Sequence, residues 1–155
     1  GATVYRMRFS ALTIILVLSL AYVMNFSGQT MSIGQFLAGA GPAFAFISPV
    51  LGWVGTAVTG SDTSSNALFA TLQHSAAQAN PVYAGVTPDL FLAANTMGGV
   101  IAKMVSPQSL AIAAVSTQVR EADIMKATLP WSLGLLCGLC CLVALEAGPL
   151  NFIIP

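Results

Sequence analysis

Long runs without charged side chains constrain this sequence more than any other feature. Residues 10–26, 33–59 and 129–145 contain no Lys, Arg, Asp or Glu. Charged residues make up 6% of the chain, against about 25% in soluble domains. A mainly apolar helix of about 20 residues spans a bilayer. The sequence therefore predicts an all-α integral membrane protein that crosses the membrane several times.

The few charged and reactive side chains argue against several classes of protein. Five basic and five acidic residues give a formal net charge of zero, so there is no basic patch for nucleic acid. Cys137, Cys140 and Cys141 lie in the last apolar run, where too few neighbouring ligands favour packing over a metal site. No nucleophile–base pair of recognisable spacing is present. We expect neither an enzyme nor a protein that binds a metal or cofactor.

Two polar segments interrupt the apolar sequence. The first covers residues 60–66, and the second covers residues 94–99 and continues to Lys103 and residues 106–109. Non-helical backbone at membrane depth must be buried in protein or line a watery cavity. Ionisable groups at that depth, here Asp62 and Lys103, point to function. The two segments predict a protein that carries a polar solute across the membrane.

Length and polarity predict a re-entrant hairpin around the first polar segment. Residues 66–80 are too short and too polar to cross a bilayer alone. Three of their side chains add to this polarity: Gln73, His74 and Gln78. We predict a hairpin over residues 33–80, with arms at 44–59 and 66–78 and a tip at 60–66. Two complete spans would leave the topology of the remaining chain unchanged and are the alternative.

The second polar segment predicts a helix that is broken within the membrane. Residues 90–119 are long enough to span, but polar and helix-breaking residues interrupt them. We expect the backbone to unwind at Asn95 and Thr96, which precede two glycines. Pro107 suits the first turn of a second half-helix.

Spanning helices are also predicted at residues 10–26 and 129–150, the latter after a polar loop at 118–128. A cleaved signal peptide is the alternative for the first, but its apolar run exceeds the usual length of about 7–15 residues. We expect the chain to be a piece of a longer one. Basic residues favour the cytoplasmic side, so we expect four of them to lie inside: Arg6, Arg8, Arg120 and Lys126. The hairpin then enters and leaves the membrane from the outer face.

The hairpin tip has groups for an organic anion and a co-transported cation. Ser61, Ser64, Ser65 and Asn66 lie beside the start of the returning helix, where unpaired N–H groups attract anions. Simple capping of two helix ends is the alternative. Asp62 is predicted to carry a proton or bind a cation, with Ser61 in the same ion-coupling site. The alternative for Asp62 is an N-cap without a transport role.

Asn95, Thr96 and Lys103 complete the predicted substrate site. The first two offer an amide and a hydroxyl where the helix is expected to unwind. Placed in the middle of the membrane, Lys103 would attract a monocarboxylate or pair with Asp62. Placed lower, it would only anchor the helix at the interface, and tilt alone decides between these positions.

These segments resemble the bacterial L-lactate permease family. The resemblance is carried by Gly52 and Trp53, by TGSDTSSNALF at residues 59–69, and by AANTMGGV and KMVSPQS at residues 93–100 and 103–109. It covers nearly the whole chain and is weakest at residues 76–88 and in the last helix. Members of this family are much longer, and the chain is similar to their C-terminal part.

The resemblance implies uptake of lactate, and often glycolate, with protons across the bacterial inner membrane. It also implies a transporter built from inverted repeats, each with a hairpin tip and a broken helix, of which this chain would be the C-terminal one. By this analogy Ser64, Ser65 and Asn66 contact substrate and ion from the tip, and Asn95 and Thr96 from the broken helix. The expected partners are the substrate anion, a proton, the lipid bilayer, and the missing N-terminal half or another subunit.

Two other functions stay open at this point. A sodium-coupled carrier of another small organic anion would have the same polar segments. A membrane subunit that only scaffolds a partner would have them without transporting anything. The resemblance favours proton symport of lactate and related 2-hydroxy monocarboxylates over both.

Overall fold

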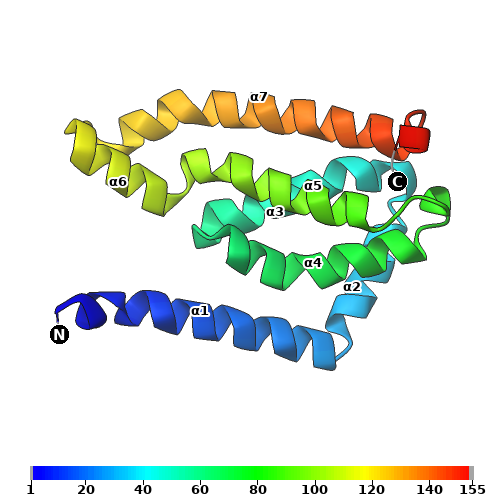
Figure 1. Cartoon of the computed structure of the whole chain (residues 1–155), viewed down its shortest axis with the longest axis horizontal. Helices are drawn as coiled ribbons and strands as arrows, with labels where there is room; N and C mark the ends of the chain where they lie inside the picture. The colour runs from blue at the N-terminus through cyan, green and yellow to red at the C-terminus, as the bar shows by residue number, and fades with distance from the viewer. Residues whose placement is uncertain (1, 154–155) are drawn as a thin grey trace.

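The chain folds into α-helices that lie roughly along one axis (Figure 1). The computed structural model describes the backbone of residues 2–153 and the side chains of residue 12 and residues 15–152. Within this part of the chain there is no strand. The elements in order are α1 (Ala2–Phe26), α2 (Gln29–Ala38), η1 (Gly41–Ala43), α3 (Phe44–Thr59), α4 (Asp62–Ala79), η2 (Pro81–Tyr83), α5 (Asp89–Ala102), η3 (Lys103–Val105), α6 (Pro107–Thr117), α7 (Glu121–Ala147) and η4 (Asn151–Ile153).

Helices α3 and α4 form a hairpin whose tip lies part-way along the bundle. Figure 1 shows α1, α7 and the pair α5–α6 extending well beyond this tip. Three described segments are long and apolar enough to cross a membrane, namely Gly41–Thr59, Asp89–Thr117 and Glu121–Ala147. Helix α4 is not among them, because polar side chains are spread along it.

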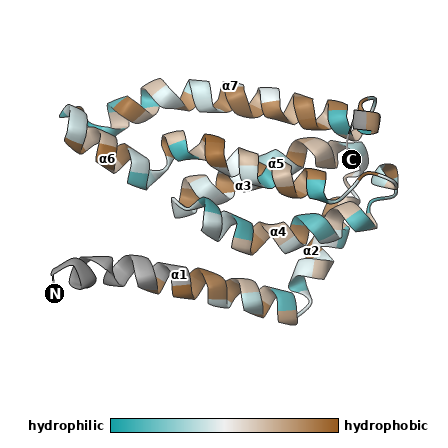
Figure 2. Ribbon diagram, in the orientation of Figure 1, coloured by the Kyte–Doolittle hydropathy of each residue, from teal (hydrophilic) through white to brown (hydrophobic). Residues whose placement is uncertain are grey.

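Hydrophobic residues recur along the helices (Figure 2), and many of their large side chains are exposed. Phe26 is 87% exposed, Phe36 82% and Val115 83%. Soluble monomers rarely expose large contiguous apolar patches, whereas lipid tails cover such side chains without cost. The exposed apolar helices and the three candidate spans together make this chain a membrane protein.

The hairpin turn between α3 and α4 has only two non-helical residues. Gly60 adopts a left-handed conformation, with φ of 73°, and its N–H donates to Thr56 O at 2.8 Å; glycine takes this conformation without a Cβ penalty. Ser61 is extended and its side chain accepts a hydrogen bond from the Ser64 N–H at 3.3 Å. One residue therefore ends α3 and the next caps α4.

Helices α3 and α5 approach so closely that glycine is required at their contact. A Cβ on Gly52 would overlap the backbone of Asn95, and a Cβ on Gly98 would overlap the backbone of Pro49. The glycines thus lie on opposite helices and each faces the other helix's backbone. Small residues allow such approach between membrane helices, and here they bring the Asn95 region against the hairpin.

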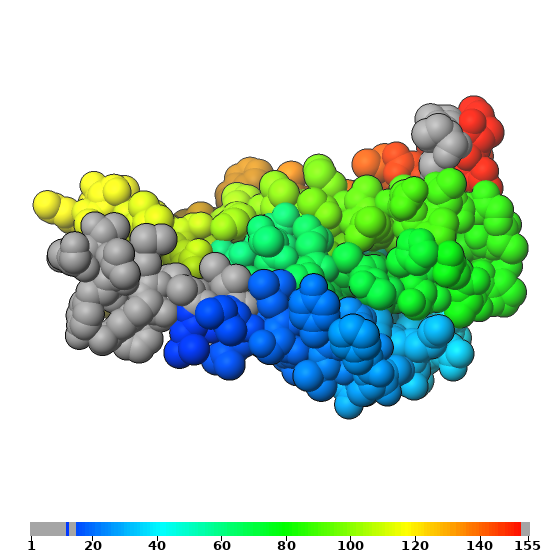
Figure 3. Space-filling model, turned by 60° about the horizontal axis from the view of Figure 1, so that its bottom comes forward, coloured from blue at the N-terminus to red at the C-terminus, as the bar shows by residue number. Residues whose placement is uncertain are grey.

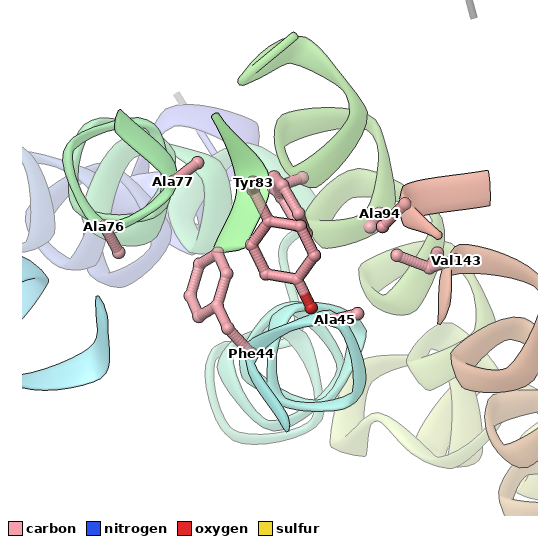
Figure 4. Close-up of a cluster of buried hydrophobic side chains, with 9 residues drawn as sticks. Phe44, Ala45, Ala76, Ala77, Tyr83, Ala94 and Val143 are labelled. Atoms are coloured by element: carbon pink, nitrogen blue, oxygen red, sulfur yellow. The ribbon is translucent and has the colours of Figure 1, made fainter. Parts of the chain in front are cut away.

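Three aromatic rings pack at the open end of the hairpin, in the buried cluster drawn in Figure 4. Phe91 lies with its ring centroid 4.9 Å from those of both Phe44 and Tyr83. The Tyr83 hydroxyl donates to Pro42 O at 2.7 Å. This cluster fixes the base of the hairpin to the start of α5, while the polar residues gather nearer the tip.

Helix α1 is joined to the rest of the bundle mainly through α4 and α2. Figure 3 shows α1 and α2 lying along the surface of the helices behind them. Helix α1 ends at Phe26, as predicted, but it begins at Ala2 and not at residue 10. Arg6 and Arg8, which support the predicted orientation, lie outside the residues whose side chains are described.

Several predicted boundaries are wrong, each for a physical reason. The break between α5 and α6 is at residues 103–106 and not at Asn95 and Thr96, which lie inside α5. Ser106 is extended, with ψ of 143°, because a residue before proline avoids the helical region. The predicted polar loop at 118–128 is mostly helix, since α7 begins at Glu121, with Glu121 and Asp123 in its first turn where acidic side chains favour the helix dipole.

Candidate functional site

Asn66, Asn95 and Thr96 form one hydrogen-bonded cluster between the hairpin and α5. The Asn95 Nδ2 donates to Asn66 Oδ1 at 2.6 Å, and Thr96 Oγ1 donates to the same oxygen at 3.2 Å. Asn66 lies near the start of α4, and the other two residues lie in the middle of α5. The structure therefore brings together three residues that the sequence assigned to the two separate polar segments.

This cluster extends in both directions as a continuous chain of side chains. Toward the tip, Asn66 Nδ2 donates to Asp62 Oδ2 at 3.4 Å. Toward the interior, Gln73 Nε2 donates to Asn95 Oδ1 at 2.7 Å and to Ser48 O at 2.9 Å. Gln73 and Asn95 have no exposed surface in the described structure. A hydrogen-bonded path thus runs from the backbone of α3 to a carboxylate at the tip.

The second oxygen of Asp62 lies in a small space beside α5. Asp62 Oδ1 and Thr56 Oγ1 are buried, and neither has a hydrogen-bond partner among the described residues. A Cβ on Gly99 would overlap Asp62 Oδ1 and would lie 2.7 Å from Thr56 Oγ1. Glycine at position 99 therefore leaves room for two oxygens to converge. Buried unpaired polar atoms cost about 1–3 kcal/mol each, so a proton or small cation bound there would be stabilised.

Lys103 lies at the break between α5 and α6 and binds the hairpin tip. Its Nζ donates to Gly60 O at 3.0 Å, a carbonyl at the C-terminal end of α3, where a cation is favoured. The described residues contain one ion pair, Arg120 with Asp123 at 2.9 Å, so the alternative in which Lys103 pairs with Asp62 is not seen in this structure. The Gln108 side chain also packs against Gly60, since a Cβ there would lie 2.9 Å from Gln108 Cδ.

The serines of the tip are used mainly to hold the hairpin together. Ser61 is the N-cap of α4, which corrects the alternative of an N-cap role for Asp62. Ser65 Oγ donates to Gly52 O at 3.1 Å and joins the two arms. Ser64 is buried and contributes its backbone N–H to the cap. Asn66 is therefore the tip residue whose side chain is hydrogen-bonded to side chains of α5.

Four residues of this region were not among those predicted for the site: Ser48, Thr56, Gln73 and Gln108. Gln73 had a visible signal, because a glutamine in a short membrane arm needs partners. Thr56 and Ser48 had none, since hydroxyls are common in membrane helices and bond their own backbone. Their place in the site depends on which face of α3 meets α5, and that follows from the glycine contact described above.

Comparison with known proteins identifies the family of this chain. The model of the L-lactate permease family matches residues 1–148. The L-lactate permeases of Salmonella typhi and Bacillus subtilis (strain 168) are 45% and 43% identical over 100% and 99% of the chain. The glycolate permease GlcA of Escherichia coli (strain K12) is 45% identical over 84% of the chain. No solved structure matches the chain.

The chain is much shorter than these relatives. It covers 28% of the Salmonella typhi permease, 27% of the Bacillus subtilis permease and 23% of GlcA. The matches nevertheless include both polar segments, because they extend over all or most of the chain. By the match of its whole length to these proteins, the chain belongs to the L-lactate permease family.

Proposed function

We propose that this chain is part of a permease that carries lactate and related 2-hydroxy monocarboxylates, such as glycolate, across the bacterial inner membrane by proton symport. In this proposal α3 and α4 form a re-entrant hairpin, and α5–α6 is a broken spanning helix. The chain then represents one of two inverted repeats, and the remaining repeat completes the transport path. The related proteins named L-lactate permease and glycolate permease support the substrate class.

The observation that carries this proposal is the contact between the hairpin tip and α5. Asn66, Asn95 and Thr96 meet there through bonds of 2.6 and 3.2 Å. Each asparagine has a second amide N–H beyond the hydrogen bond that it donates in the cluster. A monocarboxylate needs such donors in a site that water and lipid do not fill. Few other groups in this apolar chain could bind an anion at that depth.

The helix ends at the tip and at the break support anion binding. Helices α4 and α6 begin at Asp62 and Pro107, and the N-terminus of a helix carries a partial positive charge. Broken helices in secondary transporters present their ends to substrate in this way. Ser64 and Ser65 contribute by holding the start of α4, and Lys103 supplies positive charge beside the tip.

Asp62 is the proposed proton carrier, with Ser61 shaping the turn around it. Its Oδ1 has no described hydrogen-bond partner and lies near the Thr56 hydroxyl. A carboxylate at membrane depth that can be neutralised by a proton suits a symporter. Sodium coupling through the same oxygens is the competing mechanism.

Uptake of labelled L-lactate by proteoliposomes containing the full-length permease tests this function. An inward proton gradient should drive accumulation, while a sodium gradient at equal pH should not. Asp62→Asn should lose gradient-driven accumulation but keep exchange of lactate across the membrane. Uptake that follows sodium would support the sodium-coupled carrier, and absence of uptake under both gradients would support a scaffold subunit.

A further inference from the structure

The buried Gln73 makes no hydrogen bond to a residue of the tip, yet it begins the series of hydrogen bonds that reaches Asn66 and Asp62 there. We infer that Gln73 is a positioning residue that orients the amides of Asn95 and Asn66, so that they present N–H donors toward the tip. This inference rests on the proposed function for its effect on substrate binding. The orientation itself follows from the hydrogen bonds of the described residues.

The direction of these hydrogen bonds is set at the Ser48 carbonyl. The atom of Gln73 that lies 2.9 Å from Ser48 O must be the amide nitrogen, because a backbone carbonyl can only accept. The second N–H of the same nitrogen is directed at Asn95, 2.7 Å away, so the atom of Asn95 facing it must be the amide oxygen. Asn95 consequently turns its nitrogen toward Asn66.

The remaining links follow in the same direction. Asn66 faces the Asn95 nitrogen with its oxygen at 2.6 Å and turns its own nitrogen toward Asp62 Oδ2. A carboxylate accepts hydrogen bonds when ionised, so the far end of the chain demands the same direction as Ser48. Thr96 agrees, because its hydroxyl can donate to Asn66 Oδ1.

This orientation is maintained at a cost to Gln73. Both hydrogens of its amide are used, but its buried Oε1 has no partner among the described residues. Turning the amide around would place Oε1 against Ser48 O and Asn95 Oδ1, two further acceptors. The residue therefore keeps one unpaired oxygen so that the amides beyond it stay aligned.

The alignment determines which groups the substrate meets. With Gln73 present, the side-chain oxygens of Asn95 and Asn66 both accept hydrogen bonds from neighbouring amides. The groups left to bind a substrate are then the second N–H of each asparagine amide. Without Gln73, Asn95 has no donor on its oxygen side and its amide can turn, which would direct an oxygen toward Asn66. An anion would then face acceptors for part of the time, so its affinity should fall.

The test uses the full-length permease with Gln73→Met, which keeps an unbranched side chain of similar length. Gln78→Met is the matched control, since Gln78 lies exposed on the same helix. We expect the KM for L-lactate to rise about tenfold in Gln73→Met, equivalent to about 1.4 kcal/mol, with Vmax little changed. The control should keep the wild-type KM. If Gln73→Met does not fold, Gln73→Glu, whose side chain has no N–H to donate, should raise KM in the same way.

A second readout does not depend on transport. The infrared carboxylate band of Asp62, identified as the band that Asp62→Asn removes, should move in Gln73→Met at alkaline pH because the bond from Asn66 is weakened. An unmoved band together with an unchanged KM would overturn the inference. Failure of the wild-type protein to take up lactate would instead overturn the proposed function. The infrared band would still decide how the amides of Asn95 and Asn66 are oriented.

Discussion

The amide nitrogen of Asn95 lies 2.6 Å from the amide oxygen of Asn66, although the two residues are 29 positions apart in the sequence. One belongs to the returning arm of the hairpin and the other to the following helix. A buried hydrogen bond between side chains in lipid contributes on the order of 1 kcal/mol. Its position beside the hairpin tip makes it the centre of the proposed transport site.

Gly98→Ala should destabilise the protein by about 1–3 kcal/mol, because overpacking forces the helices apart. The added Cβ would overlap the backbone of Pro49 and push α5 away from α3. Gly138→Ala on α7 is the control: nothing lies within 4 Å of its Cβ position, and alanine favours a helix by about 1 kcal/mol. Thermal unfolding in detergent should therefore separate the two variants. Equal melting temperatures would contradict the close α3–α5 contact.

The depth of the hairpin tip can be tested with a cysteine at Thr63, which is exposed in the structure. In a background with Cys137, Cys140 and Cys141 replaced by alanine, a membrane-impermeant maleimide should label Thr63→Cys slowly from the cytoplasmic side. Gln118→Cys, in the loop between α6 and α7, should be labelled rapidly from that side. Equally rapid labelling at both positions would mean that α3 and α4 cross the membrane completely.

Lys103→Met should loosen the hairpin tip, since the Gly60 carbonyl loses the ammonium 3.0 Å away. We expect a small, membrane-permeant thiol reagent to label Thr63→Cys several-fold faster in this background. Lys126→Met is the control because Lys126 is exposed on α7, away from the tip. An unchanged labelling rate in Lys103→Met would show that the lysine does not hold the tip.

Much of the helix arrangement follows from local sequence signals. Helix α3 begins and ends at the residues predicted for the descending arm, because Gly60 provides a clear helix end. The break in α5–α6 was predicted to exist but was placed too early. Gly98 and Gly99 resemble helix breakers in sequence, whereas in the structure they allow close contact within a continuous helix. Packing of this kind depends on the partner helix and has no local signal.

For the candidate site as well, sequence signals identified residues but not their contacts. The polar residues Asn66, Asn95 and Thr96 were identifiable because such side chains are costly in an apolar chain. Their pairing, the contact of Lys103 with Gly60, and the use of Ser65 to join the arms depend on the relative rotation of three helices. Residue type therefore indicated which polar side chains to consider, and tertiary packing determined which of them meet in one hydrogen-bonded cluster.

Equilibrium binding of labelled L-lactate to the purified full-length permease tests most directly whether a monocarboxylate binds where Asn66 meets Asn95. Asn66→Ala and Asn95→Ala should each weaken binding at least about tenfold, or about 1.4 kcal/mol, because both remove donors from the cluster. Asn25→Ala should bind as the wild type does, since Asn25 is exposed on α1. Wild-type affinity in folded Asn66→Ala and Asn95→Ala proteins would contradict the account.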